Sequence, residues 1–178
     1  ILAGGTPREN PYFDKVRREA ESFHGTDIEL MPNLTNSELK RLYGKASLFW
    51  HACGLGETDP HLIEYFGMTT VEAMQNYCVP IVIDGGGQRE IVEHGISGFR
   101  FKTIDELESY TLNMINDGKL REEIAKKSYE RSQCFTSMIF RKNVLEFFSD
   151  VENRLRGGED LEVRSKKCCG GFWDGLVI

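Results

Sequence analysis

Residues 64–80, with the sequence EYFGMTTVEAMQNYCVP, decide the fold of this chain. Their pattern predicts a loop that leads into a helix over residues 70–77. The apolar residues 81–83 that follow predict a buried strand, and Asp84 with three consecutive glycines predicts a turn into another helix. Two carboxylates, Glu64 and Glu72, bracket the segment with seven residues between them. We therefore expect the rest of the chain to hold this segment at the edge of a sheet.

The composition indicates one globular domain. A chain of 178 residues is long enough to bury one hydrophobic core, and its 40% hydrophobic and 28% charged residues fall in the usual globular range. The net charge of −6 argues against a nucleic-acid partner, because neutralising phosphates requires clustered Lys and Arg. No apolar run approaches the roughly 20 residues that span a bilayer, so we expect no transmembrane segment.

The five cysteines are odd in number and scattered, and none has the spacing of metal ligands. A disulfide framework would favour an even number in a smaller chain. We therefore interpret them as reduced thiols of a cytoplasmic protein. The cysteines are Cys53, Cys78, Cys134, Cys168 and Cys169.

Short apolar strands alternate with helices in the first part of the chain. Asn10-Pro11 predicts a helix start, Thr35 with Glu38 predicts a capping box, and Gly44 is expected to end the second helix in the left-handed conformation. The predicted strands are residues 1–3, 28–31, 46–50, 80–84 and 98–101.

Only helical patterns follow the last strand. Thr103 with Glu106 predicts a helix start and Gly118 its end, and another helix is expected at residues 120–129. From residue 157 to 178 the periodicity is lost, and we expect a flexible tail. The helix predicted at residues 137–150 carries apolar side chains that we expect to point inward, namely Ile139, Phe140, Val144, Phe147 and Phe148.

This alternation predicts an α/β fold, a Rossmann-like parallel sheet with helices on both faces and a helical C-terminal extension. We place this domain at residues 1–156. Because the chain starts without Met inside an apparent strand, we interpret it as N-terminally truncated. Ligands of such folds bind beyond the carboxyl ends of the strands. The loops expected there are residues 4–9, 51–69 and 84–88.

Glu72 has two interpretations. Residues 69–72 fit a capping box, in which the Glu72 carboxylate returns a hydrogen bond to the N–H of Thr69 and adds about 1 kcal/mol to stability. Alternatively, Glu72 accepts hydrogen bonds from a vicinal diol, as acidic residues do for ribose in nucleotide sites. The residue pattern leaves both open.

Glu64 starts no apolar run, so it is either a solvated loop acid or part of a site. Gly67 would let the backbone approach a ligand closely. The N–H groups of Gly67, Met68 and Thr69 would point outward at a helix N-terminus, which carries roughly half a positive charge and suits an anion.

His51 follows a buried-looking strand at its carboxyl end, and a structural role and a site role are equally supported. The glycine turn at residues 85–87 lacks the spacing of a dinucleotide fingerprint, but it is a second glycine-rich helix start. Phe66 and Tyr65 would either stack on a ligand ring or join the core. Arg89 is expected to pair with a helix acid rather than to meet a phosphate.

Together these residues resemble the donor-binding half of the retaining GT-B glycosyltransferases of family 4 (group 1). That family has a Glu, an aromatic-Gly pair, a Glu-Ala-Met helix, a Pro before an apolar strand and a Gly-Gly-x-x-Glu-Ile-Val turn. The resemblance covers about residues 1–150. The matching residues are Glu64, Phe66, Gly67, Glu72, Ala73, Met74, Pro80, Gly86, Gly87, Glu90, Ile91, Val92, Gly95 and Gly98.

The resemblance implies a transferase of hexosyl type that uses a nucleotide-sugar donor and retains the anomeric configuration. It implies that Glu72 binds the ribose hydroxyls and that Glu64 is catalytic, holding the donor sugar or stabilising charge at the anomeric carbon. It implies no metal and no other cofactor, because positive groups and helix termini steady the leaving diphosphate. The residues we place in the donor site are His51, Phe66, Gly67, Met68, Thr69, Glu72 and Gly86.

The chain departs from the family in four respects. The Arg and Lys that neutralise the diphosphate in the family, and the acceptor-binding N-terminal domain, would both precede Ile1. The loop at residues 51–63 is longer than usual, and Asn76-Tyr77-Cys78 replaces a glycine-containing turn. We therefore expect a fragment that is inactive alone. The alternatives are a non-catalytic nucleotide- or sugar-binding module of the same fold and a GT-B sugar-nucleotide epimerase.

Overall fold

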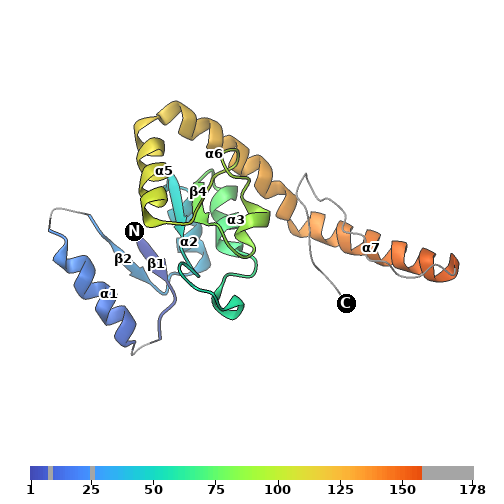
Figure 1. The fold of residues 1–178 in the computed structure, drawn as a ribbon, viewed down its shortest axis with the longest axis horizontal. Coiled ribbons are helices and arrows are strands. Elements are labelled where there is room, and N and C mark those ends of the chain that lie inside the picture. The colour runs from blue at the N-terminus through green and yellow to red at the C-terminus, as the bar shows by residue number, and fades with distance from the viewer. Residues whose placement is uncertain (8–9, 25–26, 158–178) are drawn as a thin grey trace. The chain divides into compact units, whose positions relative to one another are not determined.

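The computed structural model describes residues 1–7, 10–24 and 27–157, which form two compact units (Figure 1). The first unit, Ile1–Lys45, contains β1 (Leu2–Gly4), α1 (Pro11–Ser22), β2 (Leu30–Pro32) and α2 (Asn36–Tyr43). Its two strands are parallel, with Leu2 opposite Leu30.

Local capping signals set the helix starts of this unit. Oδ1 of Asn10 accepts hydrogen bonds from the N–H groups at the start of α1, as predicted. The capping box of α2 is complete, with Thr35 and Glu38 each accepting from the backbone of the other. The predicted left-handed end at Gly44 is wrong. Its φ is −64°, and its N–H bonds back to Lys40, so the helix ends in a right-handed turn.

The second unit begins at Ala46 and is built on the parallel strands β3 (Leu48–His51), β4 (Val79–Ile83) and β5 (Phe99–Phe101). The central strand, β4, is buried at all five residues. The remaining elements of this unit are η1 (Pro60–Leu62), α3 (Met68–Gln75), α4 (Gln88–Ile91), α5 (Ile104–Asn116), α6 (Gly118–Ser132), η2 (Gln133–Phe135) and α7 (Ser137–Gly157).

Alternate residues of β4 face opposite layers of helices, which explains the apolar run in the sequence. Val82 packs with Val71 and Met74 of α3 and with Ile91 of α4. On the other face, Val79 packs with Met114 of α5 and Ile124 of α6. Helices thus cover both faces of this sheet (Figure 1). The prediction of a Rossmann-like parallel α/β fold is confirmed, with the five strands divided between a two-stranded and a three-stranded sheet.

The helix boundaries near Gly67 and Gly118 differ from the sequence prediction. α3 begins at Met68, two residues before Thr70, because Gly67 adopts a left-handed conformation and turns the chain early. Gly118 starts α6 instead of ending α5, because the Asp117 carboxylate caps α6 by accepting from the N–H of Leu120.

The last helix, α7, runs to Gly157 and packs against η2. Its inward apolar face was predicted wrongly for three residues: Phe140, Phe147 and Phe148 are 70%, 50% and 63% exposed. Ile139 and Val144 are partly buried. Within the described residues, no helix is both long enough and apolar enough to span a membrane. The predicted flexible tail lies outside the described residues, apart from Gly157.

Candidate functional site

The N-terminus of α3 presents free backbone donors. Its N-cap, Gly67, has φ 101° and ψ 53° and no side-chain cap. The Gly67 carbonyl accepts from Thr70 and Val71 at 3.0 and 3.2 Å. Among the described residues, no acceptor binds the N–H groups of Gly67, Met68 and Thr69. These donors, together with the positive end of the helix, form a suitable contact for an anion.

The capping interpretation of Glu72 is wrong. Because α3 starts at Met68, Glu72 is its fifth residue and is too far along the helix to return a bond to the first turn. The side chain is exposed, and no hydrogen bond or ion pair joins its carboxylate to a described residue. Only its backbone carbonyl is engaged, by Nδ2 of Asn76 at 2.8 Å. The carboxylate is therefore available to a ligand.

His51, the last residue of β3, lies beside Glu64 at the carboxyl end of that strand. Nε2 of His51 is 3.7 Å from Oε2 of Glu64, and the two side chains are 14% and 34% exposed. The other carboxylate oxygen of Glu64 accepts from the N–H of Phe66 at 3.3 Å, so this N–H is not free for a ligand. Burial lowers the pKa of His51, and the Glu64 charge offsets only part of that shift. The imidazole is therefore neutral near pH 7.

Gln88 contacts His51 and was missed by the sequence interpretation. It is the first residue of α4 and is fully buried, and its Nε2 lies 3.3 Å from Nδ1 of His51. A Cβ atom at Gly67 would lie 2.6 Å from that same nitrogen, so glycine is needed there. The only feature of the sequence that could have pointed to Gln88 is its position, as a polar residue directly after a glycine turn at the end of a buried strand.

The glycine turn after β4 holds the loop that carries Glu64. A Cβ atom at Gly86, which has φ 51°, would lie 2.1 Å from the carbonyl oxygen of Glu64. The N–H of Gly87 donates to that carbonyl at 3.0 Å. Gly86 thus lies at the site, where the absence of a side chain lets the turn after β4 contact the backbone of Glu64.

Phe66 is anchored at the rim of the site by aromatic and cationic contacts. Its ring meets Phe135 edge-on at 6.0 Å, and the guanidinium of Arg131 lies 5.1 Å from the centre of the Phe135 ring. Arg131 is buried and also donates to the carbonyl of Ile91. Tyr65 is 70% exposed and contacts Nδ1 of His61 through its hydroxyl. Of the two aromatic residues, Phe66 is the less exposed, at 38%, and its ring contacts η2.

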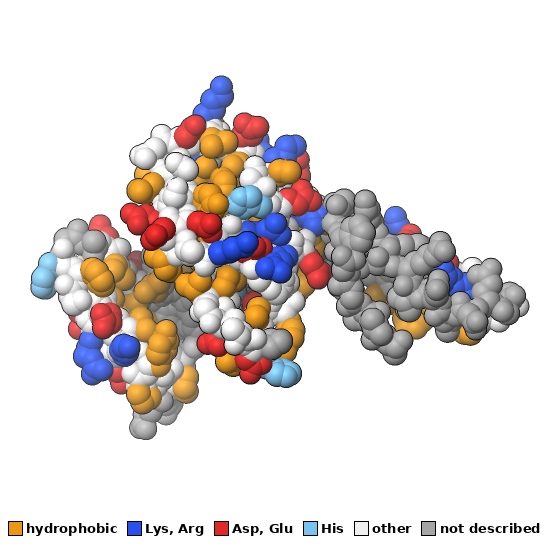
Figure 2. Space-filling view, in the orientation of Figure 1, with side chains coloured by type: hydrophobic (Ala, Val, Ile, Leu, Met, Phe, Trp, Pro, Cys, Tyr) orange, Lys and Arg blue, Asp and Glu red, His pale blue; other side chains and the backbone are white. Residues whose placement is uncertain are grey.

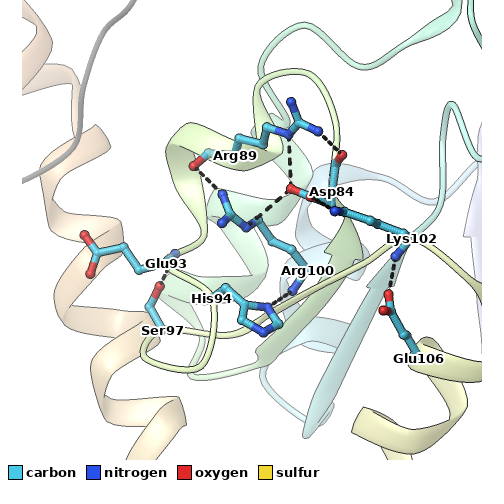
Figure 3. A network of polar contacts seen from close by, with 8 residues as sticks. All are labelled: Asp84, Arg89, Glu93, His94, Ser97, Arg100, Lys102 and Glu106. Atoms are coloured by element: carbon cyan, nitrogen blue, oxygen red, sulfur yellow. Dashed lines mark hydrogen bonds and ion pairs between the residues drawn. The ribbon is translucent and has the colours of Figure 1, made fainter.

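Basic side chains gather on one face of the molecule (Figure 2), and a connected group of them surrounds Asp84 (Figure 3). Nε of Arg89 donates to Oδ1 of Asp84 at 3.1 Å, and Arg100 and Lys102 approach the same carboxylate at 3.6 Å. Arg89 therefore pairs with the acid at the end of β4 and not with a helix acid. This network ties α4 and β5 to the end of β4.

The sequence matches the family model described as "Glycosyl transferases group 1" over residues 1–131. The chain belongs to this family. No curated protein matches this group 1 glycosyltransferase chain significantly.

Solved structures share the fold of this glycosyltransferase chain. Anabaena Alr3699/HepE in complex with UDP-glucose is 24% identical with a TM-score of 0.64, over 78% of this chain and 37% of that one. A glycosyltransferase from Rickettsia africae is 18% identical with a TM-score of 0.65, over 84% and 38%. The C-terminal domain of LpcC from Francisella tularensis is 22% identical with a TM-score of 0.54, over 72% and 64%.

The family model confirms the predicted group 1 membership, and the solved structures share the predicted GT-B fold. The chain spans about 37% of the length of Alr3699/HepE and 64% of the LpcC domain.

Proposed function

We propose that this chain binds a nucleotide-diphosphate sugar and presents the sugar for transfer with retention of its anomeric configuration, as in family 4. The observation that carries the proposal is the start of α3, where free N–H groups lie between two carboxylates. The Glu72 carboxylate has no partner among the described residues, and the Glu64 carboxylate lies beside His51. Membership of group 1 supports it, as does the complex of the similar Alr3699/HepE with UDP-glucose.

The diphosphate would bind at the N-terminus of α3. The N–H groups of Gly67, Met68 and Thr69 are free for it, and the helix contributes positive charge without a metal ion. The N–H of Phe66 is already bonded to Glu64 and is excluded from this set. The positive N-terminal end of α3 would also stabilise the nucleoside diphosphate as it separates from the sugar.

The two carboxylates would bind hydroxyl groups at either end of the diphosphate. Glu72 would accept hydrogen bonds from the vicinal hydroxyls of the ribose. Glu64 would hold hydroxyls of a hexose or stabilise positive charge at the anomeric carbon, with neutral His51 beside it. A hydrogen bond to a charged group contributes about 1.5–3 kcal/mol, so the loss of either carboxylate should weaken binding about tenfold or more.

The acceptor would bind outside the described residues. The chain spans 37% of the length of Alr3699/HepE, and we propose that a separate acceptor-binding domain completes the enzyme. This chain alone would then bind donor but transfer sugar poorly. A cytoplasmic location, where nucleotide sugars are made, fits the proposal.

Calorimetric titration of the chain with UDP, GDP, ADP and their sugar conjugates tests the proposal. We expect one nucleotide series to bind, and Glu72→Gln to weaken that binding about tenfold. Glu108→Gln is the matched control, because Glu108 is an exposed acid on α5, away from α3. Binding that is equally strong in Glu72→Gln, or no binding of any series even with upstream residues of the protein restored, would overturn the proposal.

A further inference from the structure

A chain of polar contacts runs from Gln88 through His51 to Glu64. Nε2 of the Gln88 amide lies 3.3 Å from Nδ1 of His51, and Nε2 of the imidazole lies 3.7 Å from Oε2 of Glu64. The three side chains come from α4, from the end of β3 and from the loop before α3. They are therefore held together by the tertiary fold and not by neighbouring positions in the sequence.

The two side-chain contacts of the imidazole, with Gln88 and with Glu64, favour the same tautomer. With Nε2 of the Gln88 amide facing the ring, Nδ1 accepts from it and carries no proton. The proton of the neutral ring is then on Nε2, where it faces a carboxylate oxygen. With the amide reversed and the proton on Nδ1, the bare Nε2 lone pair would face the negative charge of Glu64. The contact with Glu64 thus independently selects the amide orientation that the Gln88 contact requires.

We propose that Gln88 is a positioning residue whose amide fixes the Nε2–H tautomer of His51. The imidazole then donates a hydrogen bond toward Glu64 and into the site, where it orients the carboxylate or a donor-sugar hydroxyl. The tautomer itself is a property of the free protein. Its use in holding a donor sugar rests on the proposed function.

The packing around Gln88 distinguishes this role from a purely structural one. Its Oε1 is buried and has no hydrogen-bond partner among the described residues. A buried acceptor without a partner destabilises a fold, so this amide is not placed where it maximises stability. The backbone nevertheless accommodates it, since only glycine at position 67 leaves space for Nε2. A side chain of the same shape without polar atoms would fill this space at least as well.

Nitrogen-15 NMR of the imidazole rings tests the proposal on the whole chain without any ligand. Long-range H–N correlations identify which ring nitrogen carries the proton, and a His51→Gln spectrum assigns the signal among the four histidines. We expect wild-type His51 to be the Nε2–H tautomer. We expect Gln88→Met to fold with unchanged or higher thermal stability and to show a mixture of the two tautomers. Gln133→Met, which removes an exposed amide elsewhere, is the control and should leave the His51 signal unchanged.

Either of two outcomes overturns the proposal: an Nδ1–H tautomer in the wild-type protein, or an unchanged tautomer in Gln88→Met. The wild-type spectrum decides the first even where the variant fails to fold. Titration with the UDP, GDP and ADP sugars then measures the consequence, and we expect Gln88→Met to weaken binding several-fold. If no donor binds to the wild-type protein, the proposed function fails, while the tautomer readout still decides the role of Gln88.

Discussion

The N–H of Gly87 donates to the carbonyl of Glu64 at 3.0 Å, and a Cβ atom at Gly87 would lie 2.3 Å from the carbonyl oxygen of Tyr65. The turn after β4 thus holds the loop before α3 through a backbone contact that only glycine permits. This contact is sufficient to explain glycine at this position.

Gly87→Ala should therefore push the loop that carries Glu64 away from the turn. We predict a loss of about 1–3 kcal/mol in the free energy of unfolding, as for other overpacked sites, together with weaker nucleotide-sugar binding. Urea denaturation and calorimetry measure the two effects. Gly118→Ala is the control, because a Cβ atom there meets its nearest neighbour, Nη2 of Arg121, at an ordinary 3.6 Å. Equal losses in both variants would contradict the prediction.

Asp84 neutralises three cations that would otherwise repel one another (Figure 3). We predict that Asp84→Asn destabilises the protein by about 1–3 kcal/mol at low ionic strength, since Asp84 is only 17% exposed and its removal leaves like charges together. Because salt screens repulsion at the surface, about 0.5 M NaCl should restore part of the loss.

Urea denaturation at two salt concentrations measures this salt-dependent part. Glu130→Gln is the control, because it breaks an exposed ion pair with Lys127 that is 2.8 Å long and should change stability by less than about 0.5 kcal/mol. A loss in Asp84→Asn that does not depend on salt would show that hydrogen bonding, and not charge balance, is the role of Asp84.

Much of this fold could be predicted from the sequence, because the interactions concerned are made by residues that are close together in the chain. The capping box of Thr35 and Glu38 needs only its own four residues, and it is formed as predicted. The apolar run of β4 predicted a strand buried on both faces for the same reason. The capping box assigned to Glu72 had the right residue types but failed, because the left-handed Gly67 starts α3 earlier.

The parts of the site that escaped prediction depend on contacts between distant residues. His51 and Glu64 were predicted to lie at the carboxyl edge of the sheet, because both fall in the loop that follows a predicted strand. Their 3.7 Å contact with each other was not predicted. Gln88 approaches His51 across 37 positions of sequence, and its place after a glycine turn does not by itself show that its side chain turns inward. The grouping of the strands into two sheets likewise depends on long-range pairing that apolar patterns do not encode.

Tyr77 has φ 62°, which is unfavourable for an aromatic residue, yet its ring stacks on Tyr129 at 4.4 Å with an interplanar angle of 8°. The left-handed conformation costs about 1–2 kcal/mol, and an aromatic stack contributes about 0.5–1.5 kcal/mol. Tyr77→Gly should therefore change stability by less than about 1 kcal/mol, because relief of strain offsets loss of the stack. Tyr129→Ala loses the stack alone and should destabilise the protein more.

A double-mutant cycle of these two tyrosines, followed by urea denaturation, measures the stack directly. We expect a coupling of about 0.5–1.5 kcal/mol, so that Tyr129→Ala costs less once Tyr77 is glycine. If the two effects simply add, the rings do not stabilise each other and the stack does not offset the strained backbone.

Burial lowers the pKa of His51 below its ordinary value of 6.5, while the Glu64 charge raises it in part. Between the folded-state pKa and about 6.5, the unfolded chain binds more protons at His51 than the folded protein does. Stability must therefore fall as the pH is lowered through this window. Removing the Glu64 charge takes away the larger of the two influences that oppose burial, so Glu64→Gln should lower the pKa of His51 further and steepen the loss.

The unfolding free energy, measured between about pH 5 and pH 7.5, isolates this contribution when variants are compared. His51→Gln should have the shallowest dependence, wild type an intermediate one and Glu64→Gln the steepest. NMR titration of His51 in the folded state checks the cause independently. A higher pKa for His51 in Glu64→Gln than in wild type would mean that the carboxylate does not stabilise the protonated ring, and the two side chains would then not interact as their 3.7 Å separation indicates.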